Sequence, residues 1–553
     1  MKPSARAEPA RAGLIVGLAL LHFACALHLA GWIALACGAG LSGWLVLPAW
    51  AAASASGAAR GGRRGALLAA AAVVLVSSGA LLLAATVFDV SWDGQAYHQE
   101  AVLALRGGWN PLRDGPLSLV RPDNIWINHY PKGVWIAQAV LFAASSSLEA
   151  AKAIGLIALV AAAALAHELL RARGTGRLAA GAAALVLAGN PIATAQLGSF
   201  YVDGVAVSLM LAFLCLALHP TEQARPSGLA GQAAALGFLL NTKFTSVVYA
   251  VVLLGGLAAA LRPGLPERRR QLLSHAAALL IGVVGLGFDP YVSNTVQHGH
   301  PFHPVMGQHP VDFLSIQLTP SFQQRPRLVR LLIATFARPS NHNDEPKLAW
   351  PAINDPDEAA ALAQADVRIG GFGPLWGSIV AAAFALGLAA LARGRLSRPA
   401  LGLAAAIGVS VLLNPACWWA RYVPQLWFLP VALAILLLSQ PAPQPSRLRP
   451  AGVALLLWCG FDAALVARAA WTGQWQASQE ARHQLERLAR VPGPVLVRWN
   501  GFEANRARLD AFKIAYAPTR GQTTISAERL VGSRAEIFLP PPRALAATTE
   551  AAP

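Results

Sequence analysis

Acidic and aromatic residues gather in the segment 88–112, FDVSWDGQAYHQEAVLALRGGWNPL, directly after an apolar run long enough to cross a membrane. If residues 93–105 are helical, Asp93, Tyr97 and Glu100 fall at positions i, i+4 and i+7 and share one face. A carboxylate on that face can act as a general base beside an aromatic surface that binds a sugar. The alternative is a solvated interfacial helix in which Asp93 is an N-cap.

Three basic residues lie at the ends of predicted membrane-spanning segments: Lys132 in HYPKG, Lys243 in NTKFT and Arg421 in RYVPQ. A cation placed there is costly unless it meets water or an anion. The planar fork of arginine also suits a phosphate group. Lys243 and Arg421 are therefore predicted to meet an anion such as phosphate. For Lys132, snorkelling to the membrane surface is the more common arrangement, and binding of a phosphate is the alternative.

The motif YVDG contributes Tyr201 and Asp203 at the start of another apolar run. Asp203 is predicted either to cap a helix or to have a functional role, and Tyr201 to contact substrate. His129 is interpreted as a polar residue of the substrate site rather than a metal ligand. The spacing of His298, His300 and His303 matches no known ligand motif, so a divalent metal is not favoured.

The composition indicates what kind of scaffold must position these residues. Of 553 residues, 55% are apolar and 13% charged, and the mean hydropathy is +0.48, which excludes an ordinary soluble protein. The net charge of +17 does not indicate nucleic-acid binding, because the arginines form short clusters between apolar runs, as the positive-inside rule requires. These clusters are Arg60, Arg63, Arg64; Arg171, Arg173, Arg177; Arg262, Arg268, Arg269, Arg270; Arg393, Arg395, Arg398; and Arg447, Arg449.

The apolar runs predict an all-α polytopic membrane protein with about thirteen spans of roughly 20 residues each. The run 134–170 is counted as one crossing that begins as an interfacial helix. The predicted spans are 13–31, 34–53, 66–87, 134–170, 178–199, 204–219, 229–241, 244–261, 271–290, 371–391, 399–415, 423–439 and 450–471. The predicted domains are 1–65 (N-terminal lead and hairpin), 66–290 (transmembrane module with loop 88–133), 291–370 (loop), 371–471 (C-terminal helices) and 472–553 (small tail).

Placing every arginine cluster in the cytoplasm puts all candidate site residues on the opposite side of the membrane. The segments predicted on that side are 88–133, 200–203, 241–243, 291–370, 414–422 and the tail, whose VLVRW stretch predicts a strand and whose last residues are expected to be disordered. The five cysteines show no CxxC spacing and predict neither disulfides nor a zinc site. Walker A, GxGxxG and HExxH patterns are absent from the sequence, so it does not support ATP-driven or nicotinamide chemistry.

Six motifs between roughly residues 66 and 440 resemble those of the GT-C glycosyltransferases, both in their order and in the side of the membrane on which they are predicted to lie. They are SWDGQAYHQ, HYPKG, YVDG, NTKFT, YVSNTVQHGHPFHP and RYVPQLWFLP. The pattern is most similar to the protein-mannosyltransferase and aminoarabinose-transferase-like group. The resemblance implies a GT-C-type fold with a large first periplasmic loop, a polyprenyl-phosphate sugar donor and inversion at the anomeric carbon. It also implies that Asp93 is the catalytic base, that Asp203 is the second acid, and that Lys132, Lys243 and Arg421 meet the lipid phosphate.

Two departures limit the resemblance. The lone Asp203 stands where the oligosaccharyl-transferring branch has paired acids, which weakens a metal requirement, and the hairpin 13–53 precedes the loop-bearing span. We expect a glycosyltransferase with a hydroxyl acceptor (a glycolipid, polysaccharide or protein), no cofactor and no nucleic-acid partner. High Ala and Arg usage is typical of GC-rich bacteria and favours a bacterial inner membrane with the site facing the periplasm. The alternatives are a transporter or flippase of a lipid-linked substrate, which inverted repeats would favour, and a non-catalytic scaffold.

Overall fold

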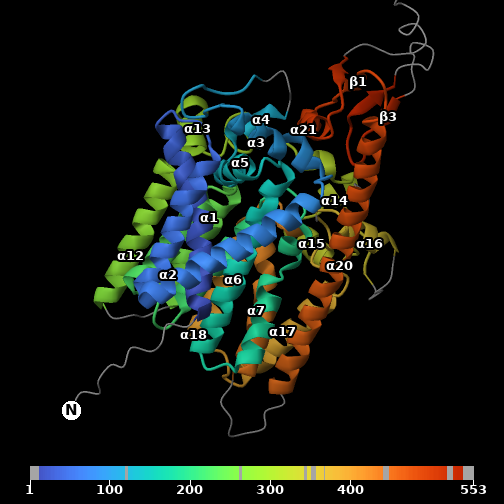
Figure 1. Cartoon of the computed structure of the whole chain (residues 1–553). Helices are drawn as coiled ribbons and strands as arrows, with labels where there is room; N and C mark the ends of the chain where they lie inside the picture. The colour runs from blue at the N-terminus through green and yellow to red at the C-terminus, as the bar shows by residue number, and fades with distance from the viewer. Residues whose placement is uncertain are drawn as a thin grey trace, which may run out of the picture.

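Helices form most of the protein, as the apolar runs predict (Figure 1). The computed structural model describes residues 12–118, 123–260, 265–341, 345–349, 356–366, 368–439, 448–519 and 527–539. The predicted N-terminal lead up to residue 11 and the predicted disordered end of the tail after residue 539 lie outside these residues.

The α-helices of the described residues follow one another with few long interruptions. In chain order they are α1 Ala12–Ala36, α2 Val46–Thr86, α3 Gln99–Arg106, α4 Asn124–His129, α5 Gly133–Ser145, α6 Ala153–Ala172, α7 Arg177–Ala188, α8 Pro191–Ala195, α9 Asp203–Leu218, α10 Pro226–Leu240, α11 Phe244–Ala260, α12 Leu265–Leu280, α13 Ser293–His298, α14 Pro320–Gln323, α15 Arg327–Phe336, α16 Pro356–Leu362, α17 Trp376–Ala392, α18 Arg398–Leu413, α19 Phe428–Leu438, α20 Leu448–Leu488 and α21 Arg506–Ala511.

Four helical segments in the described part of the chain are long and apolar enough to cross a membrane: Ala12–Ala36, Gly43–Thr86, Glu149–Ala172 and Leu448–Leu488. A fifth arises if Pro266–Gly285 and Phe288–His298, which meet at 72°, form one broken span. Eight further apolar helices have 10–17 residues, fewer than the roughly 20 of a plain span. The fold is therefore compatible with a helical membrane protein, while the count of about thirteen spans stays a prediction.

Glycine divides α2 into two arms where the sequence predicts a turn between the runs 34–53 and 66–87. Gly61 and Gly62 have non-helical backbone angles, and Gly62 has φ 56°, a conformation that glycine adopts without steric cost. The arms then pack closely, because a Cβ atom on Gly57 would lie 2.3 Å from the carbonyl oxygen of Gly65. Arg60, Arg63 and Arg64 surround this bend, as expected for a polar turn.

The run 134–170 is not one helix. Ser146 adopts a left-handed conformation (φ 55°) that ends α5, and a short 3-10 turn, Glu149–Lys152, leads into α6. The predicted single crossing therefore consists of a short helix and a separate long one. The break places two charged residues, Glu149 and Lys152, in the interior of the protein, where both are buried.

The tail folds into a small sheet with the strand order β2-β1-β4-β3, so the predicted all-α class needs this addition. Its strands are β1 Val495–Arg498, β2 Tyr516–Pro518, β3 Ala527–Arg529 and β4 Glu536–Phe538. Strand β1 pairs parallel to β2 and antiparallel to β4, and it confirms the strand expected at VLVRW. The domain boundary predicted at residue 471 falls inside α20, which runs without interruption into the tail (Figure 1).

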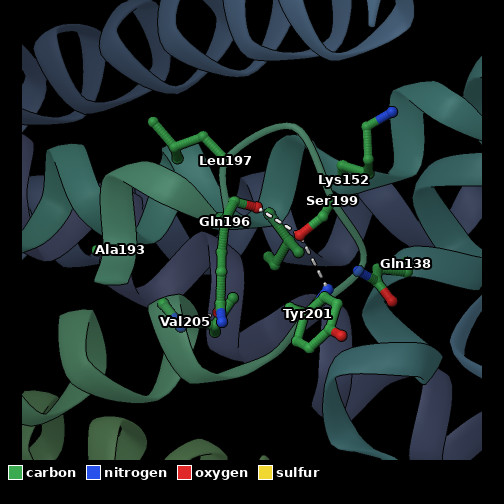
Figure 2. A pocket seen from close by; sticks show the side chains of 11 residues that line it. Gln138, Lys152, Ala193, Gln196, Leu197, Ser199, Tyr201 and Val205 are labelled. Atoms are coloured by element: carbon green, nitrogen blue, oxygen red, sulfur yellow. Dashed lines mark hydrogen bonds between the residues drawn. The ribbon is translucent and has the colours of Figure 1, made fainter. Parts of the chain in front are cut away.

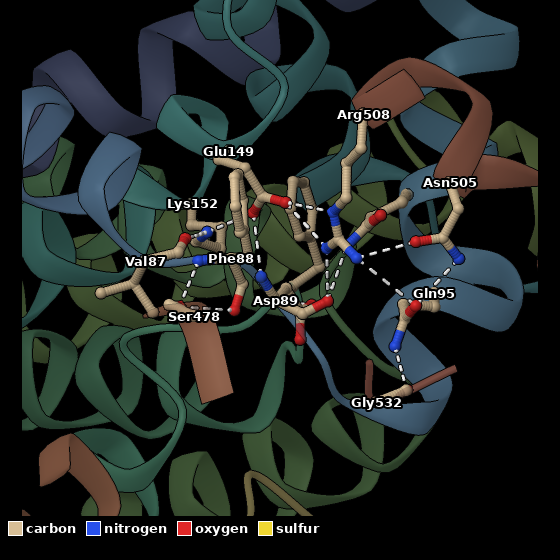
Figure 3. A network of polar contacts seen from close by, with 12 residues as sticks. Val87, Phe88, Asp89, Gln95, Glu149, Lys152, Ser478, Asn505, Arg508 and Gly532 are labelled. Carbon is tan, nitrogen blue, oxygen red and sulfur yellow. Dashed lines mark hydrogen bonds and ion pairs between the residues drawn. The ribbon is translucent and has the colours of Figure 1, made fainter. Parts of the chain in front are cut away.

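A buried polar network attaches the tail to the first loop (Figure 3). Arg508 of α21 donates to Glu149 Oε1 through Nε (3.0 Å) and Nη2 (2.8 Å), and to the carbonyl oxygen of Asp89 (2.6 Å). Lys152 pairs with Glu149 and donates to the carbonyl oxygen of Val87 (2.5 Å). The network fixes residues 87–89, directly before the segment that carries Asp93.

Arg508→Met should detach the tail, because it leaves Glu149 with only one of its two cationic partners. Removing one member of a buried ion pair typically costs about 3–5 kcal/mol. We expect a lower unfolding temperature and new protease cleavage near the end of α20. The control Arg487→Met breaks a pair with Glu528 whose side chains are 52% and 34% exposed, which is worth at most about 1 kcal/mol. Equal effects of the two substitutions would contradict the role assigned to Arg508.

Candidate functional site

Asp93 and Arg421 meet although 328 residues separate them. Arg421 Nη1 donates to Asp93 Oδ2 at 3.0 Å, and the two side chains are 8% and 19% exposed. Asp93 directly precedes a π-helical turn, Gly94–His98, and Arg421 lies in a short 3-10 turn, Ala420–Tyr422. Two segments predicted to face the same side of the membrane thus contact each other in the structure.

A second carboxylate, Asp366, also contacts Arg421. Its Oδ1 atom lies 3.0 Å from Arg421 Nε, and its Oδ2 atom lies 2.5 Å from Nη2 of Arg368. Burial disfavours the charged form of Asp366, but the guanidinium groups of Arg421 and Arg368 outweigh it and lower its pKa. Likewise, burial opposes the charge on Arg421, while the carboxylates, Asp366 first, raise its pKa.

Aromatic rings surround these charges. The guanidinium carbon of Arg421 lies 4.9 Å from the ring centre of Tyr201 and 5.0 Å from that of Tyr422. Lys243 Nζ lies 3.8 Å from the Tyr422 ring centre. Tyr422 therefore contacts two cations, and such contacts stabilise buried positive charge. The buried hydroxyl of Tyr201 has no hydrogen-bond partner among the residues that the structure describes.

Asp203 pairs with Lys243 and does not cap a helix. It is the first residue of α9, where the N-cap position belongs to Val202 and no side-chain capping bond forms. One carboxylate oxygen of Asp203 pairs with Lys243 Nζ, and the other accepts from Gln196 Nε2 at 3.0 Å. Asp203 is only 2% exposed, and both its carboxylate oxygens are engaged by neighbouring side chains.

Lys132 is buried rather than snorkelling. Its ammonium group lies 2.6 Å from Asp289 Oδ2 and donates to the carbonyl oxygens of Asn128 (2.9 Å) and Tyr130 (3.1 Å). Burial lowers the pKa of Lys132, an effect that Asp289 partly offsets. The Lys132 turn adjoins the Lys243 turn, since the backbone N–H of Gly133 donates to the carbonyl oxygen of Asn241 at 2.8 Å.

The predicted stripe of Asp93, Tyr97 and Glu100 is divided in the structure. The π-helical turn widens the helix at residues 94–98, so the spacing expected for a regular α-helix no longer holds. Tyr97 packs against His98 and Trp135, at 4.3 Å and 6.4 Å between ring centres. Glu100 instead accepts two hydrogen bonds from Arg506 of the tail, at 2.7 Å and 2.9 Å. Glu100 therefore contributes to the attachment of the tail.

His129 lies near the Lys132–Asp289 pair, next to the histidine-rich segment that begins at the end of α13. Its ring centre is 4.8 Å from that of His298 and 4.7 Å from that of His303. Burial, followed by the neighbouring histidines, lowers the pKa of His303 to about 4. The structure thus places His129 beside His298 and His303, two of the three histidines whose spacing in the sequence matches no known ligand motif.

Tyr201 also lines a small cavity (Figure 2). Polar side chains line part of it, namely Gln138, Lys152, Gln196, Ser199 and Tyr201. The oxygen of the buried Gln138 amide has no hydrogen-bond partner among the described residues. A few polar groups in a mostly apolar cavity can orient a small polar ligand or a water molecule.

Sequence reasoning missed Asp289, Asp366 and Gln196. Asp289 could have been found, because it ends an apolar run, and a carboxylate there needs a partner or a cavity. Asp366 lies in the loop segment QADVRIGG, where an acid two residues from an arginine is unremarkable. Gln196 precedes YVDG by only a few residues, but its amide contacts become evident only in three dimensions.

No family model matches this chain, and no curated protein and no solved structure is detectably similar to it. The possible chemistry must therefore come from the geometry. Each predicted phosphate-binding cation has an acidic partner: Lys132 has Asp289, Lys243 has Asp203, and Arg421 has both Asp93 and Asp366. An anionic ligand would have to compete with one of these carboxylates. The most exposed of these acids is Asp93, at 19%.

Lys243→Met should destabilise the protein, because it leaves Asp203 buried without a counter-charge. We expect a loss of about 3–5 kcal/mol of stability, measured as a lower unfolding temperature in detergent. The double variant Asp203→Asn/Lys243→Met should recover part of the loss, since it removes the unpaired charge. If Lys243→Met were no more harmful than Arg498→Met, which breaks a partly exposed pair with Glu536, Asp203 would not depend on Lys243.

Proposed function

We propose that this protein is an integral-membrane glycosyltransferase of the GT-C type. It transfers a sugar from a polyprenyl-phosphate carrier to a hydroxyl acceptor and inverts the anomeric carbon. The main support is the 3.0 Å contact between Asp93 and Arg421, which joins a candidate general base to a candidate phosphate-binding cation. Both residues were selected from the sequence for these separate roles.

In the proposed reaction, Asp93 acts on the acceptor. The acceptor hydroxyl oxygen attacks the anomeric carbon and its proton passes to the Asp93 carboxylate. The bond between the anomeric carbon and the phosphate oxygen breaks, and its electron pair leaves with the polyprenyl phosphate. General-base assistance of this kind typically contributes about 10²–10⁴-fold to the rate.

Arg421 and Lys243 would stabilise the charge that develops on the departing phosphate. In this structure Asp93 occupies one side of the Arg421 guanidinium. A donor phosphate that takes this place would separate Asp93 from Arg421 and leave the carboxylate free to accept the proton of the acceptor hydroxyl. Donor binding would thus prepare Asp93 for proton transfer, while Asp366 keeps Arg421 in position.

The aromatic residues around Arg421 offer a surface for the sugar. Tyr201 stacks against Arg421 and its buried hydroxyl has no partner among the described residues, so a sugar hydroxyl could satisfy it. The ring of Tyr422 contacts both Arg421 and Lys243. Binding sites commonly combine apolar walls with a few oriented polar groups.

The proposed setting is the bacterial inner membrane, with the site facing the periplasm. The long apolar helices are compatible with a membrane protein, and the basic clusters of the described residues lie at helix ends or bends, as the predicted topology requires. The first loop, the tail and the α13 region lie together at one end of the helices in Figure 1.

Asp93→Asn should abolish most of the donor consumption without unfolding the protein. We would reconstitute the wild type, Asp93→Asn and the control Asp114→Asn in liposomes with labelled polyprenyl-phosphate sugars. Asp114 is an exposed acid of the same loop. We expect sugar release or transfer to fall about 10²–10⁴-fold in Asp93→Asn only. A labelled lipid that crosses the bilayer equally well in all three proteins, with no donor consumed, would support a flippase instead.

A further inference from the structure

Three histidines from distant parts of the chain form one cluster: His129 at the end of α4, His298 at the end of α13 and His303 in the following turn. One ring nitrogen of each lies within 4.8 Å of the others. We propose that these residues bind one divalent transition-metal ion, with zinc as the first candidate. The inference does not depend on the proposed glycosyl transfer.

The distances allow a metal site after small side-chain movements. Zinc binds imidazole nitrogen at about 2.0–2.1 Å, so two ligands of a tetrahedral ion lie roughly 3.3 Å apart. His298 is exposed and His303 half-buried, so their rings can turn to close the remaining gap. At present these two rings stack nearly parallel, with 3.9 Å between centres and 9° between planes. Imidazole ligands favour zinc, copper, nickel or cobalt over magnesium and calcium.

The buried residue Asn294 forms hydrogen bonds with two of the three histidines, His129 and His303. Its Nδ2 atom donates to the carbonyl oxygens of His129 (3.2 Å), His303 (3.0 Å) and Pro301 (3.4 Å). This arrangement fixes the orientation of the amide and turns Oδ1 toward His129 Nδ1, at 2.8 Å. Oδ1 can only accept, so Nδ1 carries the proton and Nε2 keeps its lone pair. A second-shell partner of this kind is typical of metal-binding histidines.

A metal ion here would connect two segments that carry the Lys132–Asp289 pair. His129 lies three residues before Lys132, and α13, which ends at His298, begins four residues after Asp289. The three histidines leave a fourth coordination position for water or another ligand. The distance in sequence between His129 and the other two explains why no ligand spacing was recognisable.

Metal binding can be measured directly on the full-length protein, purified without a polyhistidine tag and treated with a chelator. Zinc binding would be followed by equilibrium dialysis with elemental analysis, and Co²⁺ by its visible absorption. The variants are His298→Ala and His303→Ala, with His309→Ala as the control, because His309 is an exposed histidine of the same segment outside the cluster.

We expect one ion per chain and the intense absorption of tetrahedral Co²⁺. Mutation of a residue that hydrogen-bonds to a metal ligand typically weakens metal binding by roughly 10–100-fold. Removing a histidine ligand itself should weaken binding by at least as much. His309→Ala should bind as the wild type does, and zinc should raise the unfolding temperature of these two proteins more than that of His298→Ala. Equal binding by all four proteins, or no stoichiometric binding by the wild type, would overturn the proposal whatever the transferase assay shows.

Discussion

The buried carboxylate of Glu149 holds together parts of the chain that are far apart in sequence. It lies between Lys152, at the entry to α6, and Arg508 of the tail. It also accepts a hydrogen bond from the backbone N–H of Asp89 at 3.0 Å. An ionised carboxylate without such partners would be very costly in the interior, so the fold depends on all three contacts being formed at once.

This constraint extends to the candidate site through Asp89. The side chain of Asp89 accepts hydrogen bonds from two backbone N–H groups, that of Phe200 at 2.7 Å and that of Ser91 at 2.9 Å. Phe200 directly precedes Tyr201. Asp93 follows four residues after Asp89. The position of the candidate base and that of the Tyr201 ring are therefore set by the same buried network, which the tail completes. The tail thus contributes to the geometry of the site although its residues do not contact Arg421 in any described interaction.

The sequence indicated which charged residues need a polar environment, but not all of their partners. Asp93, Asp203, Lys243 and Arg421 could be selected because they stand at the edges of apolar runs, and the structure places each of them in an ion pair. Their partners could not be assigned, since the contact of Asp366 with Arg421 depends on the path of a long loop. The π-helical turn at 94–98 and the pairing of Glu100 with Arg506 have no local signal in the sequence. The attachment of Arg508 to Glu149 joins residues 359 apart, beyond any periodicity argument.

The most direct measurement is a cryo-electron microscopy structure of the protein in nanodiscs with a non-transferable polyprenyl-phosphonate sugar. The proposal predicts density for the phosphonate beside Arg421 and Lys243. It also predicts that the Asp93 carboxylate, displaced from Arg421, faces the anomeric carbon at a distance that leaves room for an acceptor oxygen about 3–3.5 Å from that carbon. A ligand bound elsewhere, or one bound while the Asp93–Arg421 contact stays intact, would contradict the central claim that this pair is the catalytic site.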